Sequence, residues 1–451
     1  MKNNDIHAAA NHTFAVAKTD INREKNRNIS TKSDISESKS FKKTNRNVKD
    51  VRCPAAGKCG GCDWLGRPYE KQLADKKKLV ADLLKPYCRL EGIIPMETPY
   101  FYRNKVHAVF DRDRRGAVIA GTYEKNSHRV VAVEKCLIED EKAGEIIRTI
   151  RDLCKSFQIR IYDEDSGYGL LRHVLVRAGH TSGQYLVVLV LSSPILPDKN
   201  NFIKALRKAH PEITSVVINV NDRRTSMILG EKEQVIYGKG YIEDTLCGKT
   251  FRISPKSFYQ VNPVQTQKLY QKAIEYADFR GNERIVDAYC GIDTIGIVAS
   301  DHVKEVIGVE LNKDAVRDAR VNARINCVRN ISFYENDAGQ LLTQMAQQKA
   351  KVDAVILDPP RSGSDEAFLS SVIQIAPAKV VYISCNPVTL ARDLEYLTKR
   401  GYRAMRACAV DMFPQTAEHV EACVLLEKAG KAQPGRRGTV DRADGGMPAR
   451  T

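Results

Sequence analysis

The chemistry of this sequence centres on a cysteine near the C-terminal end, Cys385, in the string Y-I-S-C-N-P-V-T-L-A-R-D. The thiol follows an apolar run typical of a buried strand, so it is predicted to lie where a strand opens into a loop. On an open α/β sheet, reacting groups lie at the carboxyl ends of the strands. A second strand-like run ends in Asp358, and the string M-F-P-Q-T-A-E-H-V-E ends in Glu421. A thiol and two carboxylates predict nucleophilic and acid–base chemistry at one sheet edge.

The elements around these residues alternate between strand and helix from about residue 264. An amphipathic pattern at 312–326 predicts one of the helices. This alternation is typical of a parallel, doubly wound sheet. From about 100 to 250 the pattern is mostly of short strands, which one predicted helix at about 200–209 interrupts. The strands predicted in the C-terminal part end at Asp287, Glu310, Tyr334, Asp358 and Ser384.

The chain of 451 residues is long enough for two or three domains. Residues 1–48 and 429–451 are polar and contain few large apolar side chains, so we predict two disordered tails, the first of them basic. Between them we predict a central domain at 49–250 and a catalytic domain at 251–428. A helical pattern makes 67–100 a candidate to pack on the catalytic domain.

A glycine-containing turn follows the predicted strand that ends at Asp287, in the string A-Y-C-G-I-D-T-I-G. The next predicted strand ends in an acid, Glu310, about twenty residues later. In Rossmann-like sheets such an acid holds the ribose hydroxyls of a nucleotide. The glycines do not follow G-x-G-x-x-G, which disfavours a dinucleotide. The short turn with one acid favours S-adenosylmethionine, and an ordinary βα turn is the alternative reading.

The charge balance is basic, with 71 Lys and Arg against 55 Asp and Glu, a formal net charge of +16. Such an excess favours a polyanionic partner, most often nucleic acid, although some enzymes are simply basic. The first thirty residues lack the apolar core of a signal peptide, and no apolar run approaches the ~18 residues of a membrane span. We therefore expect a cytoplasmic protein without membrane contact.

Twelve cysteines in a cytoplasmic protein favour metal binding or catalysis over disulfides. The pattern Cys53-x5-Cys59-x2-Cys62, followed by Cys136, supplies four thiolates, which suit zinc or an iron–sulfur cluster. The spacing alone does not choose between these two groups. Cys88 and Cys154 match no such pattern and are expected in the core.

Four strings occur in a characteristic order: D-A-Y-C-G-I-D-T, D-P-P-R, S-C-N-P-V-T-L-A-R-D and the string that ends at Glu421. Together they resemble the signature of S-adenosylmethionine-dependent RNA uracil-5-methyltransferases, and F-Y-Q-V-N-P at 258–263 is similar to a further block of that family. The resemblance covers roughly 50–428. It implies an α/β fold: a C-terminal Rossmann-like, doubly wound methyltransferase domain, and a central, mostly β (α+β) domain that carries an iron–sulfur site.

The resemblance also implies roles for individual residues. Cys385 would add to carbon 6 of uracil, which makes carbon 5 able to attack the methyl group, and Glu421 would then remove the carbon 5 proton. Phe258 would lie against the target base, which must leave its stack. Asp358 could also hold the pyrimidine or orient Cys385. The residues implied at the S-adenosylmethionine site are Gln260, Tyr289, Glu310, Asp337 and Asp358.

The four-cysteine pattern is similar to the branch of the family that modifies rRNA and carries a 4Fe–4S cluster on Cys53, Cys59, Cys62 and Cys136. The implied function is therefore methylation of a uridine in 23S rRNA, by an RNA-binding monomer without an obligate protein partner. The alternatives are a tRNA T-loop methyltransferase and a catalytically silent iron–sulfur RNA-binding protein. An amino-methylating enzyme is disfavoured because Arg361, rather than an aromatic residue, follows D-P-P.

The chain departs from the family pattern at Asp293, where glycine is usual, and at Cys327, where a glycine that ends a helix is common. Asp tolerates the left-handed region better than most residues, so the turn is expected to form. The Asp293 carboxylate would either pair with the ammonium of the cofactor or repel its carboxylate. Residues 1–48 show no strand pattern, so the N-terminal β-barrel RNA-binding module of many family members is predicted to be absent.

Overall fold

The computed structural model describes residues 53–223, 227–417 and 419–429. The predicted basic tail, the predicted absence of an N-terminal barrel, and nearly all of the second tail fall outside these residues. Within the described part, no helix is long and apolar enough to cross a membrane.

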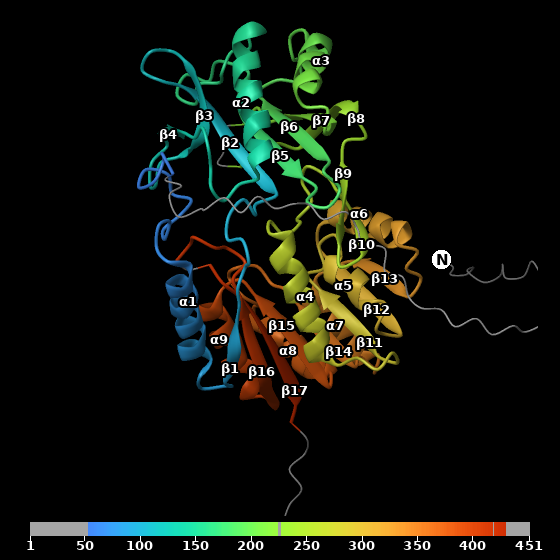
Figure 1. Ribbon diagram of the computed structural model, residues 1–451. Coiled ribbons are helices and arrows are strands. Elements are labelled where there is room, and N and C mark those ends of the chain that lie inside the picture. Colours follow the sequence, from blue (N-terminus) through green and yellow to red (C-terminus); the bar gives the residue numbers. More distant parts are fainter. Residues whose placement is uncertain (1–52, 224–226, 418, 430–451) are drawn as a thin grey trace, which may run out of the picture. The chain divides into compact units, whose positions relative to one another are not determined.

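The C-terminal part is built on an eight-stranded sheet (Figure 1), with the strand order β1-β16-β17-β15-β14-β11-β12-β13. Strands β11 to β15 pair in parallel, as the alternating pattern predicts. The sheet is not parallel throughout, however, because β17 runs antiparallel to both β15 and β16. The chain reverses there through a loop, without the helical crossover that a parallel connection needs. The strands are β1 (Leu90–Ile94), β11 (Arg284–Ala288), β12 (Glu305–Glu310), β13 (Ile331–Glu335), β14 (Ala354–Leu357), β15 (Lys379–Ser384), β16 (Tyr402–Val410) and β17 (Glu421–Lys428).

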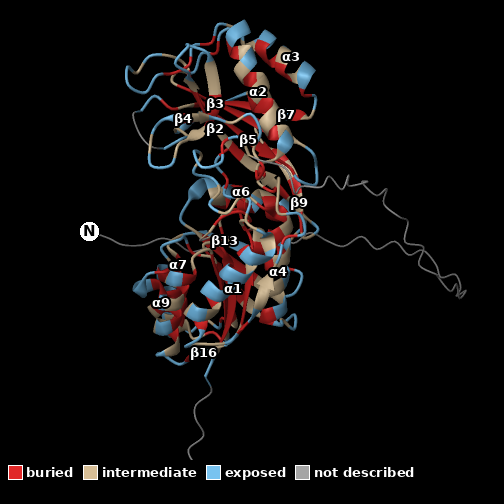
Figure 2. Ribbon diagram, turned by 60° about the vertical axis from the view of Figure 1, so that its left-hand side comes forward, coloured by how far each residue is buried: buried red, intermediate tan, exposed pale blue. Residues whose placement is uncertain are grey.

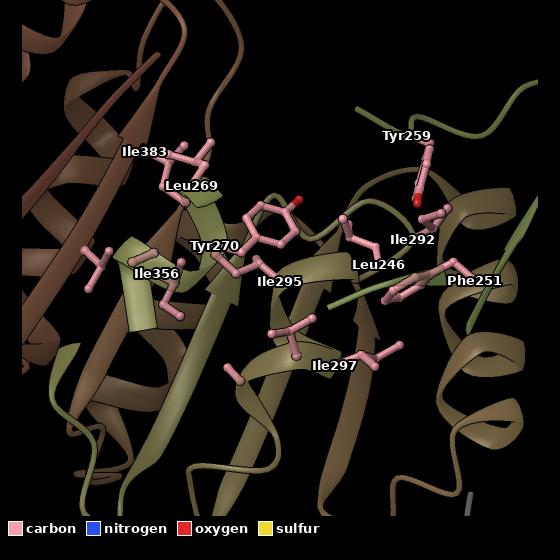
Figure 3. Close-up of a cluster of buried hydrophobic side chains, with 14 of the residues drawn as sticks. Leu246, Phe251, Tyr259, Leu269, Tyr270, Ile292, Ile295, Ile297, Ile356 and Ile383 are labelled. Atoms are coloured by element: carbon pink, nitrogen blue, oxygen red, sulfur yellow. The ribbon is translucent and has the colours of Figure 1, made fainter. Parts of the chain in front are cut away.

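Helices cover both faces of this sheet, which explains why its central strands are apolar on both faces. Successive residues of β11 face opposite ways: Ile285 belongs to one core cluster and Val286 to the other. Figure 3 shows the first cluster, with Leu269 of α4 beside the strand residue Ile383 and Tyr270 beside Ile295 of α5. The helices are α4 (Pro263–Ala277), α5 (Thr294–Ala299), α6 (Lys313–Ile325), α7 (Ala338–Gln347), α8 (Glu366–Ile375) and α9 (Pro387–Thr398).

An N-terminal segment joins this catalytic part. Helix α1 (Tyr69–Leu84) contributes Val80 and Leu84 to the second core cluster, and β1 pairs in parallel with β16. This helix therefore packs on the sheet that carries the C-terminal motifs, although the seven-stranded sheet of the central part separates the two segments along the chain.

The central part is a seven-stranded sheet, in the order β4-β3-β2-β5-β6-β7-β8, with two helices packed against it. Helix α3 (Lys199–Ala209) matches the predicted helix, but α2 (Glu141–Ser156) was missed. Its signal was present, since its buried residues have helical spacing and the Asp140 carboxylate caps it by accepting from Ala143 N at 2.8 Å. The strands are β2 (Lys105–Arg112), β3 (Val118–Tyr123), β4 (Val130–Ala132), β5 (Leu171–Ala178), β6 (Tyr185–Leu191), β7 (Ile213–Val220) and β8 (Lys232–Gly238).

Strands β5 and β6 are buried along their whole length, whereas the helices carry exposed residues on their outer faces (Figure 2). A hairpin of β9 (Ile242–Leu246) and β10 (Lys249–Ile253) follows this sheet along the chain. Helix α6 holds the hairpin through two side-chain acceptors, because Asn326 and Asn322 accept from the backbone N–H groups of Thr250 and Arg252, each at 2.8 Å.

Candidate active site

A cavity of about 520 Å³ opens where β11, β12, β14 and β15 end and where β17 begins. Its position agrees with the rule that ligands of an open α/β sheet bind at the carboxyl ends of the strands. The cavity brings together residues that lie far apart in the sequence. The predicted site residues that line it are Phe258, Gln260, Tyr289, Glu310, Asp358, Cys385 and Glu421.

Cys385 lies between β15 and α9. Asn386 caps α9 by accepting from Val388 N at 3.1 Å, and its amide donates to the carbonyl of Arg361 at 2.9 Å. The cap thus ties the thiol loop to the loop that follows β14. Burial raises the pKa of the Cys385 thiol to about 12, with smaller contributions from Glu421 and Asp358, while Arg361 opposes the shift. The thiol of the free protein is therefore protonated at neutral pH.

Glu421 is the first residue of β17 and only 2% exposed. Burial raises its pKa well above the usual range, the neighbouring Asp358 raises it further, and Arg361 lowers it. Its Oε2 has no hydrogen-bond partner among the described residues. Burial also raises the pKa of Asp358, to about 7. Glu421 and Asp358 therefore bind protons more tightly than free carboxylates do.

Glu310 organises the nucleotide side of the cavity. Its carboxylate accepts from Gly291 N at 3.1 Å and from Asn312 N at 2.8 Å, so it joins the turn after β11 to the cap of α6. Tyr289 lies in that turn with φ of 64°, and its ring is 5.1 Å from the ring of Phe368. A strand-end acid beside a tight turn is the arrangement that holds a ribose.

Three further positions singled out from the sequence, Asp337, Phe258 and Cys327, have different surroundings. Asp337 caps α7, where its carboxylate accepts from Gln340 N at 2.9 Å, and it is not among the residues that line the cavity. Phe258 lies at the cavity with 67% of its surface exposed, so its ring is free to meet a ligand. Cys327, the smaller departure from the family pattern, follows α6 with φ of 55°, the left-handed conformation in which glycine is common.

The cavity also has walls that sequence reasoning did not assign to the site. Arg103 comes from the segment before β2, and no local pattern marks it. The Tyr270 hydroxyl on α4 hydrogen-bonds Thr294 Oγ1 at 2.7 Å. Phe413 and His419 lie within the string that ends at Glu421, so that motif could have pointed to them; their rings are 5.7 Å apart.

The cysteines predicted as metal ligands meet in space. Cys53, Cys59, Cys62 and Cys136 line a second cavity, of about 430 Å³, which shares Arg103 and Val261 with the first. Burial raises the pKa of Cys62 to about 12, and the nearby Cys59 and Cys53 raise it further. Among the residues described, no three His, Cys, Asp or Glu side chains are arranged to hold a metal ion.

The two cysteines expected in the core lie elsewhere. Cys154 is 1% exposed in the core of the central part, and Cys88 is partly buried beside the second core cluster of the catalytic part.

The fold and the site define an S-adenosylmethionine-dependent RNA methyltransferase, and the comparisons with known proteins agree. A sequence model described as tRNA (Uracil-5-)-methyltransferase matches residues 68–429. An uncharacterized RNA methyltransferase of Halalkalibacterium halodurans is 41% identical over 383 residues, which are 84% of this chain and 83% of that protein. One of Clostridium tetani is 39% identical over 388 residues, 85% of this chain and 84% of that protein. The chain belongs to the tRNA (uracil-5-)-methyltransferase family.

A solved structure agrees with this assignment. The Pyrococcus abyssi tRNA (uracil-54, C5)-methyltransferase, crystallised with S-adenosyl-L-homocysteine, is 27% identical and has a TM-score of 0.69. The similarity covers 81% of this chain and 86% of that chain. The α/β methyltransferase fold predicted from the sequence is thereby confirmed, and so is a dependence on S-adenosylmethionine.

Proposed function

We propose that this protein methylates carbon 5 of a uridine in 23S rRNA through a covalent bond between Cys385 and carbon 6 of the base. The observation that carries the proposal is one cavity that contains the thiol, the carboxyl groups of Glu421 and Asp358, and the exposed ring of Phe258. Few reactions need a thiol, a proton acceptor and an aromatic platform together beside a nucleotide site. Uracil C5 methylation needs all of them because carbon 5 is not nucleophilic until carbon 6 has been attacked.

The steps follow from the residues. The Cys385 thiol gives its proton to solvent, the resulting thiolate forms a bond to carbon 6, and the electron pair of the 5,6 double bond becomes available at carbon 5. Carbon 5 takes the methyl group, and the neutral thioether S-adenosylhomocysteine leaves. Glu421 accepts the proton from carbon 5, the double bond reforms, and the Cys385 thiolate is expelled. The raised pKa of Glu421 suits this role, because a carboxylate that binds protons tightly is a stronger base.

The cavity fits S-adenosylmethionine, which supplies an electrophilic methyl group on a cationic sulfonium. Its lining includes Asp287, Glu310, Asp358 and Glu421, and Glu421 Oε2 has no partner among the described residues. Acidic groups that lack partners favour a ligand that carries positive charge. Such a ligand would also lower the pKa of Cys385, so the thiol is expected to be most reactive when the cofactor is bound.

The four cysteines favour a cluster over a zinc ion. This preference rests on the resemblance to the rRNA-modifying branch of the family, because four thiolates suit either zinc or an iron–sulfur cluster. The four cysteines line one cavity of about 430 Å³, which gives such a cluster a common location. We propose that Cys53, Cys59, Cys62 and Cys136 hold such a cluster. We also propose that the domain at 49–250, which contains these cysteines, binds RNA. Domain boundaries at 250 and 428 and a cytoplasmic location remain predictions.

The second candidate substrate is the T-loop of tRNA. It is favoured by the similarity to the Pyrococcus abyssi tRNA (uracil-54, C5)-methyltransferase. The four-cysteine set favours rRNA, because it is similar to the rRNA-modifying branch of the family. Both substrates use the same chemistry at Cys385 and Glu421, so the site alone does not choose between them.

The experiment is to map 5-methyluridine by mass spectrometry in 23S rRNA and in tRNA from a strain that lacks the gene. We expect loss at one or two positions of 23S rRNA, restored by the wild-type protein and not by Cys385→Ala. Loss confined to the tRNA T-loop would replace the first candidate by the second. Unchanged 5-methyluridine in both RNAs would overturn the proposal.

A further inference from the structure

Asp293, the residue that departs from the family pattern, lies beneath the cofactor-binding turn and faces away from the cavity. It precedes α5 with φ of 62° and is 0% exposed. Asp287 lines the cavity, but Asp293 is not among its lining residues. The carboxylate instead faces the glycines of neighbouring elements. A β-carbon added at Gly296 would lie 2.3 Å from Asp293 Oδ1, and one at Gly308 would lie 3.1 Å from it. In this position the Asp293 carboxylate neither pairs directly with the ammonium of the cofactor nor directly repels its carboxylate.

The neighbour of Asp293 is a second buried acid, Asp287, which is 1% exposed at the end of β11. Asp287 Oδ2 accepts from Gly296 N at 3.1 Å. Asp287 Oδ1 and both carboxyl oxygens of Asp293 have no donor among the described residues. Three buried acceptor atoms without donors are costly, since each lacks the hydrogen bonds that water would give it.

In the described part of the chain, the titratable groups beside this pair supply no positive charge. Asp358 faces Asp287 from the loop after β14, and the Cys290 thiol lies close to both Asp287 and Asp293. Tyr270 on α4 lies close to Asp287 and Asp358, but its hydroxyl is engaged with Thr294. Glu310, at the end of β12, also lies close to the Cys290 thiol. The titratable groups that face the pair within the described residues are therefore acids, a thiol and a phenol.

Two carboxylates in contact without a cation cannot both stay ionised in a buried site. A proton on one of them satisfies the geometry, because the protonated carboxyl then donates to the other. We propose that Asp287 and Asp293 share one proton in the free protein, and that Asp293 is thereby a positioning residue for the cofactor-binding turn at 289–293. The proposal takes the cofactor site from the proposed function, but its test needs neither RNA nor methyl transfer.

The direction of the pH dependence follows from the acids themselves. Burial raises the pKa of Asp293 to about 7, and burial together with Asp293 raises that of Asp287 well above its usual range. A carboxyl whose pKa is higher in the folded than in the unfolded state adds stability below its unfolded value of ~3.9. That stability is lost as the pH rises through the folded pKa. The turn is therefore expected to loosen as the solution passes from acid to mildly alkaline.

The test compares wild type with Asp293→Asn and Asp293→Gly. Asn adopts the left-handed conformation as readily as Asp, and its amide donates to Asp287 at any pH. Gly keeps the backbone and removes the carboxyl. By urea unfolding, the folding constant of wild type relative to Asp293→Asn should fall roughly tenfold per pH unit between pH 5 and 7, the signature of one proton. Infrared spectra at pH 6.5 should show one protonated carboxyl band fewer in Asp293→Asn.

The positioning role is tested by measuring the binding affinity of S-adenosylhomocysteine, whose sulfur is uncharged. Its affinity for wild type should weaken by about tenfold between pH 6.5 and 8.5 as the proton is lost, and its affinity for Asp293→Asn should not. The same pH dependence of folding and the same infrared band in both proteins would overturn the shared proton. If the proton is shared but the affinity of wild type for S-adenosylhomocysteine does not change with pH, the positioning role is overturned. If Asp293→Asn fails to fold, Asp293→Gly serves for the folding and infrared comparisons.

Discussion

The ammonium of Lys76 and the carboxylate of Asp411 lie 2.7 Å apart, and both side chains are completely shielded from solvent. Lys76 also donates to the carbonyl of Phe413 at 2.8 Å, and the Tyr69 hydroxyl donates to Asp411 at 2.8 Å. Helix α1 therefore holds the loop that connects β16 to Glu421. The two residues are 335 positions apart in the sequence. The wall of the candidate active site that contains Phe413 and Glu421 therefore depends on a helix that precedes the whole central part.

Breaking this pair should destabilise the protein strongly, because the remaining charge is left buried and unpaired. We expect Lys76→Met to lower the free energy of unfolding by about 3–5 kcal/mol. The double variant Lys76→Met, Asp411→Leu should recover much of that loss, since neither charge then remains. Urea unfolding measures both effects. Lys77→Met, on the exposed face of the same helix, is the matched control and should stay within ~0.5 kcal/mol of wild type. Equal losses for Lys76 and Lys77 would contradict the role of the buried pair.

Glu421→Gln should trap the reaction after methyl transfer. The thiol and the methyl donor remain, so the bond between Cys385 and carbon 6 can form, but the carbon 5 proton has no base to accept it. A methylated protein–RNA adduct that survives denaturation should accumulate under single-turnover conditions, seen as a shifted band in denaturing gels.

The controls for this experiment are the same reaction without S-adenosylmethionine and the double variant Cys385→Ala, Glu421→Gln, neither of which should give the methylated adduct. Normal turnover by Glu421→Gln, or inactivity without an adduct, would move the role of base to Asp358, whose carboxyl also has a raised pKa.

Arg361 should assist Cys385 electrostatically, because its charge opposes the rise of the thiol pKa. Arg361→Ala should therefore slow methylation near pH 7.5, and raising the pH to 9 should restore part of the rate by forming more thiolate. Arg361→Lys, which keeps the charge, should be less impaired. The measurement is the single-turnover rate at a series of pH values. A rate lost equally at every pH would instead indicate that Arg361 only binds RNA.

The cysteine cavity should contain iron. Anaerobically purified protein is expected to be brown, with about four irons per chain by elemental analysis. Cys59→Ser or removal of iron by a chelator should lose the colour and lower the midpoint of thermal unfolding. Cys327→Ser, at an exposed cysteine outside this cavity, is the control and should keep its iron. Stoichiometric zinc without iron would contradict the cluster.

Much of the catalytic fold was predictable from the sequence because its signals are local. A buried strand such as Lys379–Ser384 is a short apolar run, and its end is marked by the polar residues that follow. The antiparallel course of β17 was not predictable in this way, since an apolar run does not reveal the direction of its neighbours. The missed helix α2 is different: its apolar spacing and its Asp140 cap were readable, and the surrounding strand patterns obscured them.

The sequence by itself determined which groups could perform the chemistry: the Cys385 thiol, the Glu421 and Asp358 carboxyls, and the four cysteines of the second cavity. Only the tertiary structure decided what surrounds each group. It placed Asp337 at a helix cap and not at the cavity, and it buried Asp293 against Asp287. The physical reason is that the pKa and the reactivity of a side chain depend on burial and on neighbouring charges. Those neighbours come from distant parts of the chain, which no local pattern records.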